Sequence, residues 1–415
     1  MAVSDCAVSE RSDVFKSYDI RGVLSDDFVV SLARCVVHSY GSVVVMSDVK
    51  VSSRRLAELF AKTVFDCGNE VICCGVGPTD MASVAGRHYR LTSVMFTASH
   101  LSEGQDGIKF HESNGRPFSP EMILGLKSGV EALNSVGGSL RQVSFNRIYE
   151  SLLFKRYNEL FNYDLHGLRV LVDLKNGCGL SHHLLSKLGA IVDVVHTKGS
   201  DPSRIEPELI AKAKNYDLVI VHDFDADRIV LVNESGVIHG SLVACMLTSV
   251  LKGVVVASVD SSEVLSNYTK VVHSRVGDPF VSRAILDNNA VLGVEPSGHY
   301  TDPCFAPTSS GSLFALILAG LVIKKGISER LSAFPSVRLM MDSIKVSDKD
   351  SFMSQLASKV SNVISVIDGV KFSFNGRPAL IRPSGTEPII RYQLENPGKD
   401  SLSELGDWLR KAVGV

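Results

Sequence analysis

Three segments of this chain repeat one local pattern, and this repetition constrains the fold more than any other feature. Each is a short apolar run that ends near an aspartate and a polar turn, at residues 43–48, 170–173 and 254–260. Helical sequence follows each run, at residues 54–65, 181–188 and 263–268. Strands that alternate with helices in this way are typical of α/β units around largely parallel sheets. We therefore predict three similar α/β domains in series.

Other short runs rich in β-branched residues predict further strands, at residues 42–46, 70–74, 93–96, 169–172, 191–195, 218–221, 254–259 and 290–292. The amphipathic segment 53–65 predicts a helix, with Ser52 or Ser53 as its N-cap. The last eighty or so residues differ, since 336–345 and 370–374 resemble strands whereas 350–363 and 402–413 resemble helices. The predicted fold is α/β, with mixed sheets in three similar domains and a smaller C-terminal α+β domain, divided as 1–145, 146–242, 243–336 and 337–415.

Composition narrows the class of protein. The 415 residues are too many for one ordinary core, and 45% hydrophobic with 21% charged residues is a globular composition. A net charge of −2 without a long basic run predicts neither a nucleic acid nor a membrane as partner. The eight cysteines form no C-x-x-C pair, and neither a signal peptide nor an apolar run of about eighteen residues is present. We expect a cytoplasmic monomer or homodimer with reduced thiols and no zinc site.

A cluster of carboxylates stands between two apolar runs near the middle of the chain. Asp223, Asp225 and Asp227 occupy alternate residues and Arg228 follows at once. Three acidic side chains this close repel one another unless a cation neutralises them. Mg²⁺ suits such a site, because it takes oxygen ligands and leaves positions open for a phosphate oxygen. The alternative is a solvated acidic turn.

Three further loops carry polar side chains that could bind a ligand. Ser99 and His100 end an apolar strand, where α/β sheets place ligands, although a serine there can also be a simple turn residue. Residues 293–299 place a glutamate, a serine and a histidine among glycines, which suits a polyhydroxylated ligand or a structural loop. Residues 382–388 combine Arg382 with small and hydroxylated residues, which on physical grounds predicts a phosphate cradle.

These four loops, in this order and spacing, resemble those of the α-D-phosphohexomutases, the family of phosphomannomutase/phosphoglucomutase and phosphoglucosamine mutase. Residues 18–22, Tyr-Asp-Ile-Arg-Gly, are similar to a fifth family motif. The resemblance spans about residues 15 to 395. It implies four domains around a central cleft, in agreement with the domain pattern, and a sugar phosphate as the ligand.

The resemblance implies a role for each motif. Ser99 would carry a phosphoryl group, and Asp223, Asp225 and Asp227 would hold Mg²⁺ against it, with one oxygen of phosphoserine 99 as a further ligand. Phosphate would pass between O1 and O6 of a hexose through a hexose 1,6-bisphosphate that serves as intermediate and activator. The reactive end would be lined by Arg21, Lys109, His100 and Arg228. Lys109 would be the acid/base group, with a pKa lowered by neighbouring cations, or a purely electrostatic stabiliser of phosphate.

The same resemblance assigns the substrate contacts. Glu295, Ser297 and His299 would contact sugar hydroxyls. The phosphate that is not transferred would be clamped by residues of the C-terminal domain, namely Arg382, Ser384, Gly385, Thr386 and Arg391. The motif at residues 18–22 and the Ala226 position favour mannose or glucose phosphate, whereas residues 276–278 resemble the glucosamine branch more.

Several positions depart from the family pattern. Leu101-Ser102 replace the usual Asn-Pro, Phe224 replaces a glycine, and residues 46–50 lack one arginine of a Gly-Arg-Asp-x-Arg motif. Val294 also replaces a glycine, and Ser310 stands where aspartate is common. If position 224 required a positive φ, phenylalanine would strain it. We expect a phosphomannomutase/phosphoglucomutase. The alternatives are a phosphoglucosamine mutase, an impaired sugar-phosphate-binding paralogue, and a Mg²⁺-dependent phosphatase with an aspartyl nucleophile.

Overall fold

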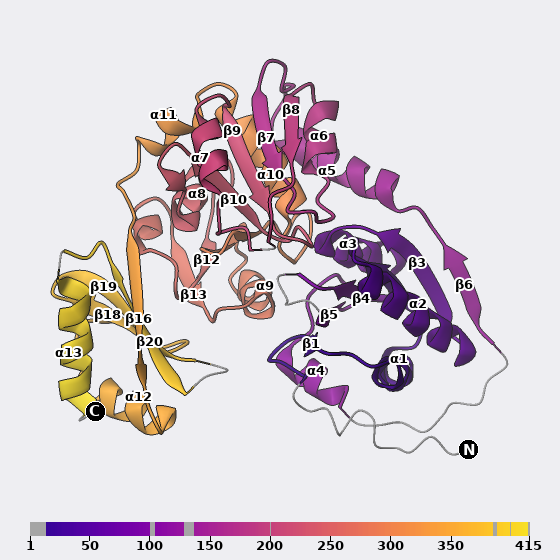
Figure 1. Ribbon diagram of the computed structural model, residues 1–415, viewed down its shortest axis with the longest axis horizontal. Coiled ribbons are helices and arrows are strands. Elements are labelled where there is room, and N and C mark those ends of the chain that lie inside the picture. Colours follow the sequence, from indigo (N-terminus) through magenta and orange to yellow (C-terminus); the bar gives the residue numbers. More distant parts are fainter. Residues whose placement is uncertain are drawn as a thin grey trace. The chain divides into compact units, whose positions relative to one another are not determined.

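The chain folds into two compact units, Met1–Ile238 with Ser297–Ser328 and His239–Pro296 with Glu329–Val415 (Figure 1). Each unit is described by itself below. The computed structural model describes residues 14–99, 104–127, 137–199, 201–384, 388–398 and 400–413.

The first sheet of the first unit is mixed, with the strand order β1-β5-β4-β2-β3-β6. Its parallel part runs through β4, β2, β3 and β6, whereas β5 is antiparallel to both β4 and β1. Helices α1 and α2 share one apolar core with this sheet. The elements are β1 (Ile20–Gly22), α1 (Asp26–Tyr40), β2 (Val43–Ser47), α2 (Val51–Asp66), β3 (Glu70–Val76), α3 (Thr79–Tyr89), β4 (Thr92–Thr97), β5 (Asp106–His111), α4 (Pro120–Gly125) and β6 (Ser139–Gln142).

The second sheet is also mixed, with the order β11-β10-β9-β7-β8. Helix α10 packs against β9, β10, α5 and α6, and every one of its residues is buried, as expected of a helix that is apolar all round. The elements are α5 (Asn146–Leu160), β7 (Arg169–Asp173), α6 (Ser181–Lys187), β8 (Ile191–Val195), α7 (Pro207–Ala213), β9 (Leu218–His222), β10 (Ile229–Asn233), β11 (Gly236–Val237) and α10 (Gly311–Val322). The first unit also contains β15 (His299–Thr301), which is not a strand of this sheet.

The second unit contains a parallel arrangement in which β12 pairs with β13 on one side and with β14 on the other. Helix α9 packs against all three strands. The elements are α8 (Gly240–Leu247), β12 (Val255–Ser258), the 3₁₀ helix η2 (Glu263–Asn267), β13 (Val271–Ser274), α9 (Asp278–Asp287) and β14 (Leu292–Glu295), followed after an intervening segment by α11 (Ile327–Leu331).

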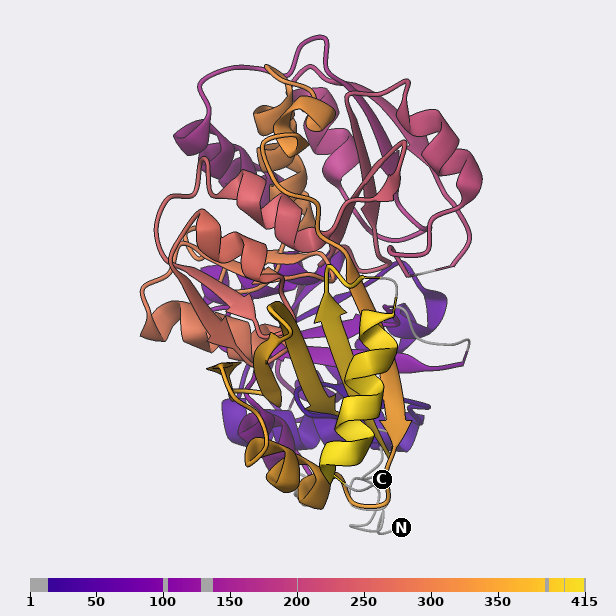
Figure 2. The same cartoon turned by 90° about the vertical axis from the view of Figure 1, so that its left-hand side faces the viewer.

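The C-terminal part of the second unit is an antiparallel sheet of order β16-β20-β19-β18-β17. Helices α12 and α13 pack against this sheet and against each other, and α13 lies along it in Figure 2. The elements are β16 (Leu339–Lys345), α12 (Lys349–Ala357), β17 (Val363–Ser365), β18 (Val370–Phe374), β19 (Arg377–Pro383), β20 (Ile389–Glu395) and α13 (Ser401–Val413).

The predicted fold class is confirmed, since α/β sheets precede a smaller antiparallel C-terminal sheet with two helices. Two local predictions were wrong. Helix α2 begins at Val51, because Ser52 and Ser53 do not cap it and their hydroxyls donate to Asp106 instead. The helix predicted at 350–363 ends at Ala357, and residues 363–365 form β17, which pairs with β18. The helical segment predicted at 263–268 is present as the 3₁₀ helix η2. No described helix is long and apolar enough to cross a membrane.

Candidate active site

The three aspartates of residues 223–227 come together in the loop between β9 and β10. These strands pair antiparallel, with His222 opposite Ile229, so the loop is a tight connection that turns the carboxylates inward. All three side chains are buried, and one oxygen from each lies within 4.8 Å of the others. In the described part of the chain, this is the one group of acidic, histidine or cysteine side chains so arranged. The predicted carboxylate cluster therefore exists as a compact donor set.

Cationic side chains balance this charge. Lys109 Nζ, from β5, lies 2.7 Å from Asp225 Oδ2 and 2.6 Å from Asp227 Oδ2. Arg228 Nε lies 2.9 Å from Asp223 Oδ2. Because Lys109 comes from the first sheet and the aspartates from the second, the charge cluster joins the two sheets of the first unit.

The pKa values of the carboxyls diverge. Burial and the neighbouring Asp227 raise the pKa of Asp223 well above its usual range, although Arg228 opposes them. Burial also acts to raise the pKa values of Asp225 and Asp227, but the opposing groups together lower both. These groups are Lys109 and Thr79 at Asp225, and Lys109, His299 and Arg228 at Asp227. The cluster therefore carries more negative charge than its burial alone would allow.

The donor set fits a hard divalent cation. Asp225 Oδ1 is buried and accepts no hydrogen bond from the described residues. A buried carboxylate oxygen without a donor is costly, and a cation removes that cost by coordination. The ligands would be Asp223, Asp225 and Asp227.

Helix α3 supports one of these ligands from the first sheet, a contact that the sequence analysis missed. Thr79, the first residue of α3, donates from Oγ1 to Asp225 Oδ2 at 2.8 Å and from its backbone N–H to the Asp225 carbonyl at 3.0 Å. Asp80 is fully buried and accepts from Tyr149 Oη at 2.6 Å and from the Ser310 hydroxyl. The N-terminus of α3 is thereby held to α5 and α10. No local sequence signal marks Thr79, because its partner lies 146 residues away.

Phe224 does not have the positive φ that would strain a phenylalanine, since it is not among the described residues with positive φ. The left-handed conformation falls on Ala226 instead, at φ 53°. Two glycines make room for this loop. A Cβ on Gly177 would lie 2.2 Å from the Phe224 carbonyl oxygen, and one on Gly311 would lie 2.6 Å from that of Ala226.

Ser99 follows β4 in a strained turn. Its φ is 44°, it is buried, and its N–H donates to Thr97 Oγ1 at 2.9 Å. Asp48 fixes this turn from the end of β2, because its Oδ2 accepts from the Ala98 N–H at 2.7 Å. A backbone held at positive φ by a non-glycine residue is a feature that clusters at functional sites. Asp48 belongs to the motif that departs from the family pattern, and the structure gives it a positioning contact that the sequence analysis did not foresee.

Arg21 and Lys109 reach the charge cluster from neighbouring strands. Arg21 is opposite Gly107 in the β1–β5 pair, and Lys109 is opposite Met95 in the β5–β4 pair. Burial alone would lower the pKa of Lys109, but Asp225 and Asp227 raise it above its ordinary value. The expectation of a lowered pKa was wrong, since the carboxylates outweigh the nearby Arg21. An ammonium so held is better suited to stabilise phosphate charge than to accept a proton.

His299, which was predicted as a sugar contact, lies beside the aspartate loop of residues 223–228. Its Nε2 lies 3.5 Å from Asp227 Oδ1, and its Nδ1 shares a hydrogen bond of 2.8 Å with Ser297 Oγ. Residues 228 and 299 also form an isolated antiparallel bridge. The first unit thus brings His299, with Ser297 beside it, close to the carboxylates. Both residues were predicted only as contacts to sugar hydroxyls.

The remaining predicted substrate residues belong to the second unit. Glu295 ends β14, is buried, and accepts from the Gly277 N–H at 2.8 Å. Arg382 in β19 donates from Nη2 to Asp368 Oδ2 at 2.8 Å. Arg391 in β20 is opposite Arg382 in the antiparallel pair, so the two arginines occupy one face of the sheet. Ser384 directly follows β19, and its carbonyl accepts from Lys349 Nζ at 2.6 Å.

Three predicted residues, His100, Gly385 and Thr386, lie outside the described residues.

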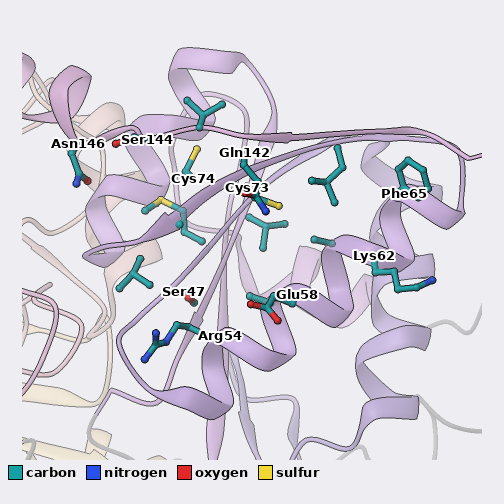
Figure 3. Close-up of a pocket in the computed structure, with 18 residues that line it drawn as sticks. Ser47, Arg54, Glu58, Lys62, Phe65, Cys73, Cys74, Gln142, Ser144 and Asn146 are labelled. Atoms are coloured by element: carbon teal, nitrogen blue, oxygen red, sulfur yellow. The ribbon is translucent and has the colours of Figure 1, made fainter.

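A cavity of about 640 Å³ lies apart from the predicted site residues (Figure 3). It is bounded by α2 on one side and by β2, β3 and the chain around β6 on the other, with Arg54, Glu58 and Lys62 projecting from α2. The small side chains of Ala57 and Ala61 face it and leave it open.

Comparison with known proteins decides the family. Residues 12–136 match the description "Phosphoglucomutase/phosphomannomutase, alpha/beta/alpha domain I", and residues 239–337 match that of domain III. A probable phosphoglucosamine mutase of Methanothermobacter thermautotrophicus is 31% identical over 398 residues, which cover 86% of each chain. The chain belongs to the α-D-phosphohexomutase family. It is a phosphohexomutase, an isomerase, and the family implies a sugar phosphate as substrate.

Other relatives and solved structures agree with this placement. The phosphohexomutase is 28% identical to the phosphoglucosamine mutase of Clostridioides difficile, over 96% of this chain and 98% of that protein. It is also 28% identical to a phosphoglucomutase/phosphomannomutase of Thermococcus kodakarensis, over 94% and 96%. A phosphoglucomutase/phosphomannomutase family protein of Burkholderia thailandensis has the same fold, with a TM-score of 0.82, 21% identity and 96% coverage of each chain. The family uses Mg²⁺, which the buried aspartate cluster fits.

Proposed function

We propose that this phosphohexomutase is a phosphoglucosamine mutase, which interconverts glucosamine 6-phosphate and glucosamine 1-phosphate. The sequence motifs favoured mannose or glucose phosphate, but the relatives support the glucosamine alternative better. The observation that carries the proposal is 31% identity to a probable phosphoglucosamine mutase over 86% of the chain. The contact between Gly277 and Glu295 is a second support, because residues 276–278 are the turn that resembles the glucosamine branch.

In the proposed mechanism, phosphoserine 99 donates its phosphoryl group to the free hydroxyl of the sugar phosphate. The hydroxyl oxygen attacks phosphorus, the bond to Ser99 Oγ breaks, and the hydroxyl proton passes to the serine oxygen. The resulting 1,6-bisphosphate then reorients in the site. Its other phosphate returns to Ser99 by the reverse of the same step. Mg²⁺ held by Asp223, Asp225 and Asp227 would supply a positive charge beside the transferring group, the main requirement in phosphoryl transfer.

Other residues would hold the reactants. Lys109, Arg21, His100 and Arg228 would stabilise the negative charge of the transferring group, and the raised pKa of Lys109 supports an electrostatic role. Glu295, Ser297 and His299 would bind the sugar. The distal phosphate would bind to Arg382, Ser384, Gly385, Thr386 and Arg391. We further propose the division into four domains, 1–145, 146–242, 243–336 and 337–415.

A coupled assay that compares glucosamine, mannose and glucose 1-phosphates tests the proposal. We expect the highest kcat/KM with glucosamine phosphate. A preference for mannose or glucose phosphate would instead support a phosphomannomutase/phosphoglucomutase, as in the T. kodakarensis relative.

Intact-mass measurement tests the role of Ser99. After incubation with a hexose 1,6-bisphosphate, the chain should gain the mass of one phosphoryl group, and the Ser99→Ala variant should not. A chain that never becomes phosphorylated and turns over none of the three sugars would contradict the mutase and favour the sugar-phosphate-binding alternative.

A further inference from the structure

We propose that Asp368 is a positioning residue that couples phosphate recognition to sugar recognition within the second unit. One oxygen of its carboxylate accepts hydrogen bonds from Arg382, which lies at the start of the predicted phosphate loop, and from Val276, in the turn beside Glu295. The proposal rests on the proposed function of Arg382 and Glu295 as substrate-binding residues. All of the contacts involved lie inside the second unit.

The first contact fixes the guanidinium of Arg382. Its Nη2 donates to Asp368 Oδ2 at 2.8 Å, a charge-assisted hydrogen bond between side chains that are 28% and 18% exposed. Arg382 Nε is buried and has no hydrogen-bond partner among the described residues. A buried N–H that is left without an acceptor costs free energy, unless a ligand supplies the acceptor. Asp368 therefore holds one nitrogen of the guanidinium and leaves another for an anion.

Gly369 allows this approach. It has a φ of +94°, and a Cβ there would lie 2.2 Å from the Ile381 carbonyl oxygen and 2.7 Å from Arg382 Cγ. Only glycine fits a position with both constraints. The backbone next to Asp368 thus lies directly against the stem of Arg382, while the Asp368 carboxylate binds its head.

The second contact reaches the sugar-binding side. The same oxygen, Asp368 Oδ2, accepts from the Val276 N–H at 3.1 Å. The next peptide donates from Gly277 N to Glu295 Oε2 at 2.8 Å. The Asp368 carboxylate therefore contacts Arg382 directly. It is linked to Glu295 through the consecutive N–H groups of Val276 and Gly277. A displacement of Asp368 would shift both.

Charge gives a reason for an acidic residue at this position. Arg382 and Arg391 are directly opposite in the β19–β20 pair, and like charges at such positions destabilise a sheet. Asp368 supplies a compensating negative charge before substrate arrives. When phosphate binds, its own charge adds to that compensation, so Arg382 does not have to move to receive it.

The test uses the full-length chain with Asp368→Ala and Asp368→Asn. We expect Asp368→Ala to raise the KM for glucosamine 6-phosphate about tenfold or more, the effect of losing one hydrogen bond to a charged group, with a smaller change in kcat. Asp368→Asn keeps an acceptor for Val276 but loses the ion pair, and it should lie between Asp368→Ala and the parent chain. Phosphorylation of Ser99 by a hexose 1,6-bisphosphate should remain possible in both.

Direct binding separates this inference from the proposed function. Calorimetric titration of the Ser99→Ala chain with glucosamine 6-phosphate and with inorganic phosphate needs no turnover. Adding Asp368→Ala should weaken both ligands, and Arg382→Met should weaken them at least as much. Asp342→Ala is the matched control, because Asp342 accepts from Tyr392 in the same sheet and no contact of its carboxylate with Arg382 or residues 276–277 is found among the described residues.

The outcomes are distinguishable. Weakening by Arg382→Met with no change in Asp368→Ala would overturn the positioning role and leave the phosphate loop intact. No weakening by either variant would overturn both the phosphate loop and the inference. An equal effect of Asp342→Ala would reduce Asp368 to a general contributor to the stability of the sheet and would also overturn it.

Discussion

The carboxylate loop of the first unit and the arginine strands of the second unit both collect like charges, but they are built differently. Asp223 and Asp225 are fully buried, and Lys109 of β5 and Arg228 of the same loop already contact them. Arg382 is partly exposed, and the ion-pair partner that the structure describes for it, Asp368, lies on a neighbouring loop. Buried like charges must be balanced before any ligand arrives, because the interior screens them poorly, whereas partly exposed charges are also screened by water. Changes at the first region should therefore alter stability and metal binding, and changes at the second should alter substrate affinity.

The largest loss of stability should come from replacing Lys109, whose ammonium contacts both Asp225 and Asp227. Lys109→Met leaves Asp225 and Asp227 buried without their ammonium, which should lower the free energy of unfolding of the metal-free protein by about 3–5 kcal/mol. Mg²⁺ should recover much of this loss, since it binds the folded state only. Urea denaturation in EDTA and in MgCl₂ measures both values.

The control for Lys109 is Lys62→Met. Lys62 forms an ion pair with Asp66 on the exposed side of α2, and its removal should change stability by less than about 1 kcal/mol. Similar losses in the two variants would contradict the difference drawn between buried and exposed charge.

A partly buried acid in the second unit, Glu263, gives the next effect on stability. Burial would raise the pKa of Glu263, but His273 and Lys371 lower it from 4.5 to about 2. A lowered folded-state pKa stabilises the protein above the unfolded pKa, and this stability is lost as the pH falls from about 4.5 to 2. Glu263→Gln should cost about 3 kcal/mol at neutral pH and progressively less below pH 4.5. Denaturation curves over this pH range should converge, and parallel curves would count against the ion pair.

A hydroxyl in the first unit should tune metal affinity. Thr79→Val keeps the shape of the side chain but removes its hydrogen bond to Asp225, and loss of such a supporting contact lowers metal affinity about 10–100-fold. Thr79→Ser should retain most of the affinity. Titration calorimetry with MgCl₂ measures it, and Thr63→Val is the control, because that hydroxyl binds only the Leu59 carbonyl within α2 among the contacts that the structure describes. Equal affinities for Thr79→Val and the parent chain would remove Thr79 from the site.

The smallest effect on stability should come from Asp80→Asn, and it should have the opposite sign to that of Glu263→Gln. Burial raises the pKa of Asp80 to about 7, although Ser310 and Tyr149 oppose the shift. A raised pKa in an acid costs stability as the pH rises from about 4 to 7, because the unfolded chain ionises first. Asp80→Asn should therefore be more stable than the parent chain at neutral pH, by about 1–2 kcal/mol after the cost of burying the amide. The advantage should vanish near pH 4, and a constant difference between the two chains would contradict the raised pKa.

The sequence predicted two strands with the bounds that the structure shows. Residues 191–195 and 370–374 form β8 and β18 as expected, because both are rich in the β-branched or aromatic residues that are favoured in strands. The helix expected at 350–363 was too long, since pairing of residues 363–365 with β18 outweighs helical periodicity. Ser52 and Ser53 did not cap α2, because Asp106 competes for their hydroxyls.

The sequence alone determined the family resemblance, the carboxylate cluster and the order of the loops, because these depend on residue type and spacing along the chain. The tertiary structure decided which side chains support them. Thr79 meets Asp225 across 146 residues, Asp80 meets Ser310 across 230, and Asp368 meets Val276 across 92. Hydrogen bonds and ion pairs act over a few ångströms, and only the folded chain brings such distant residues that close.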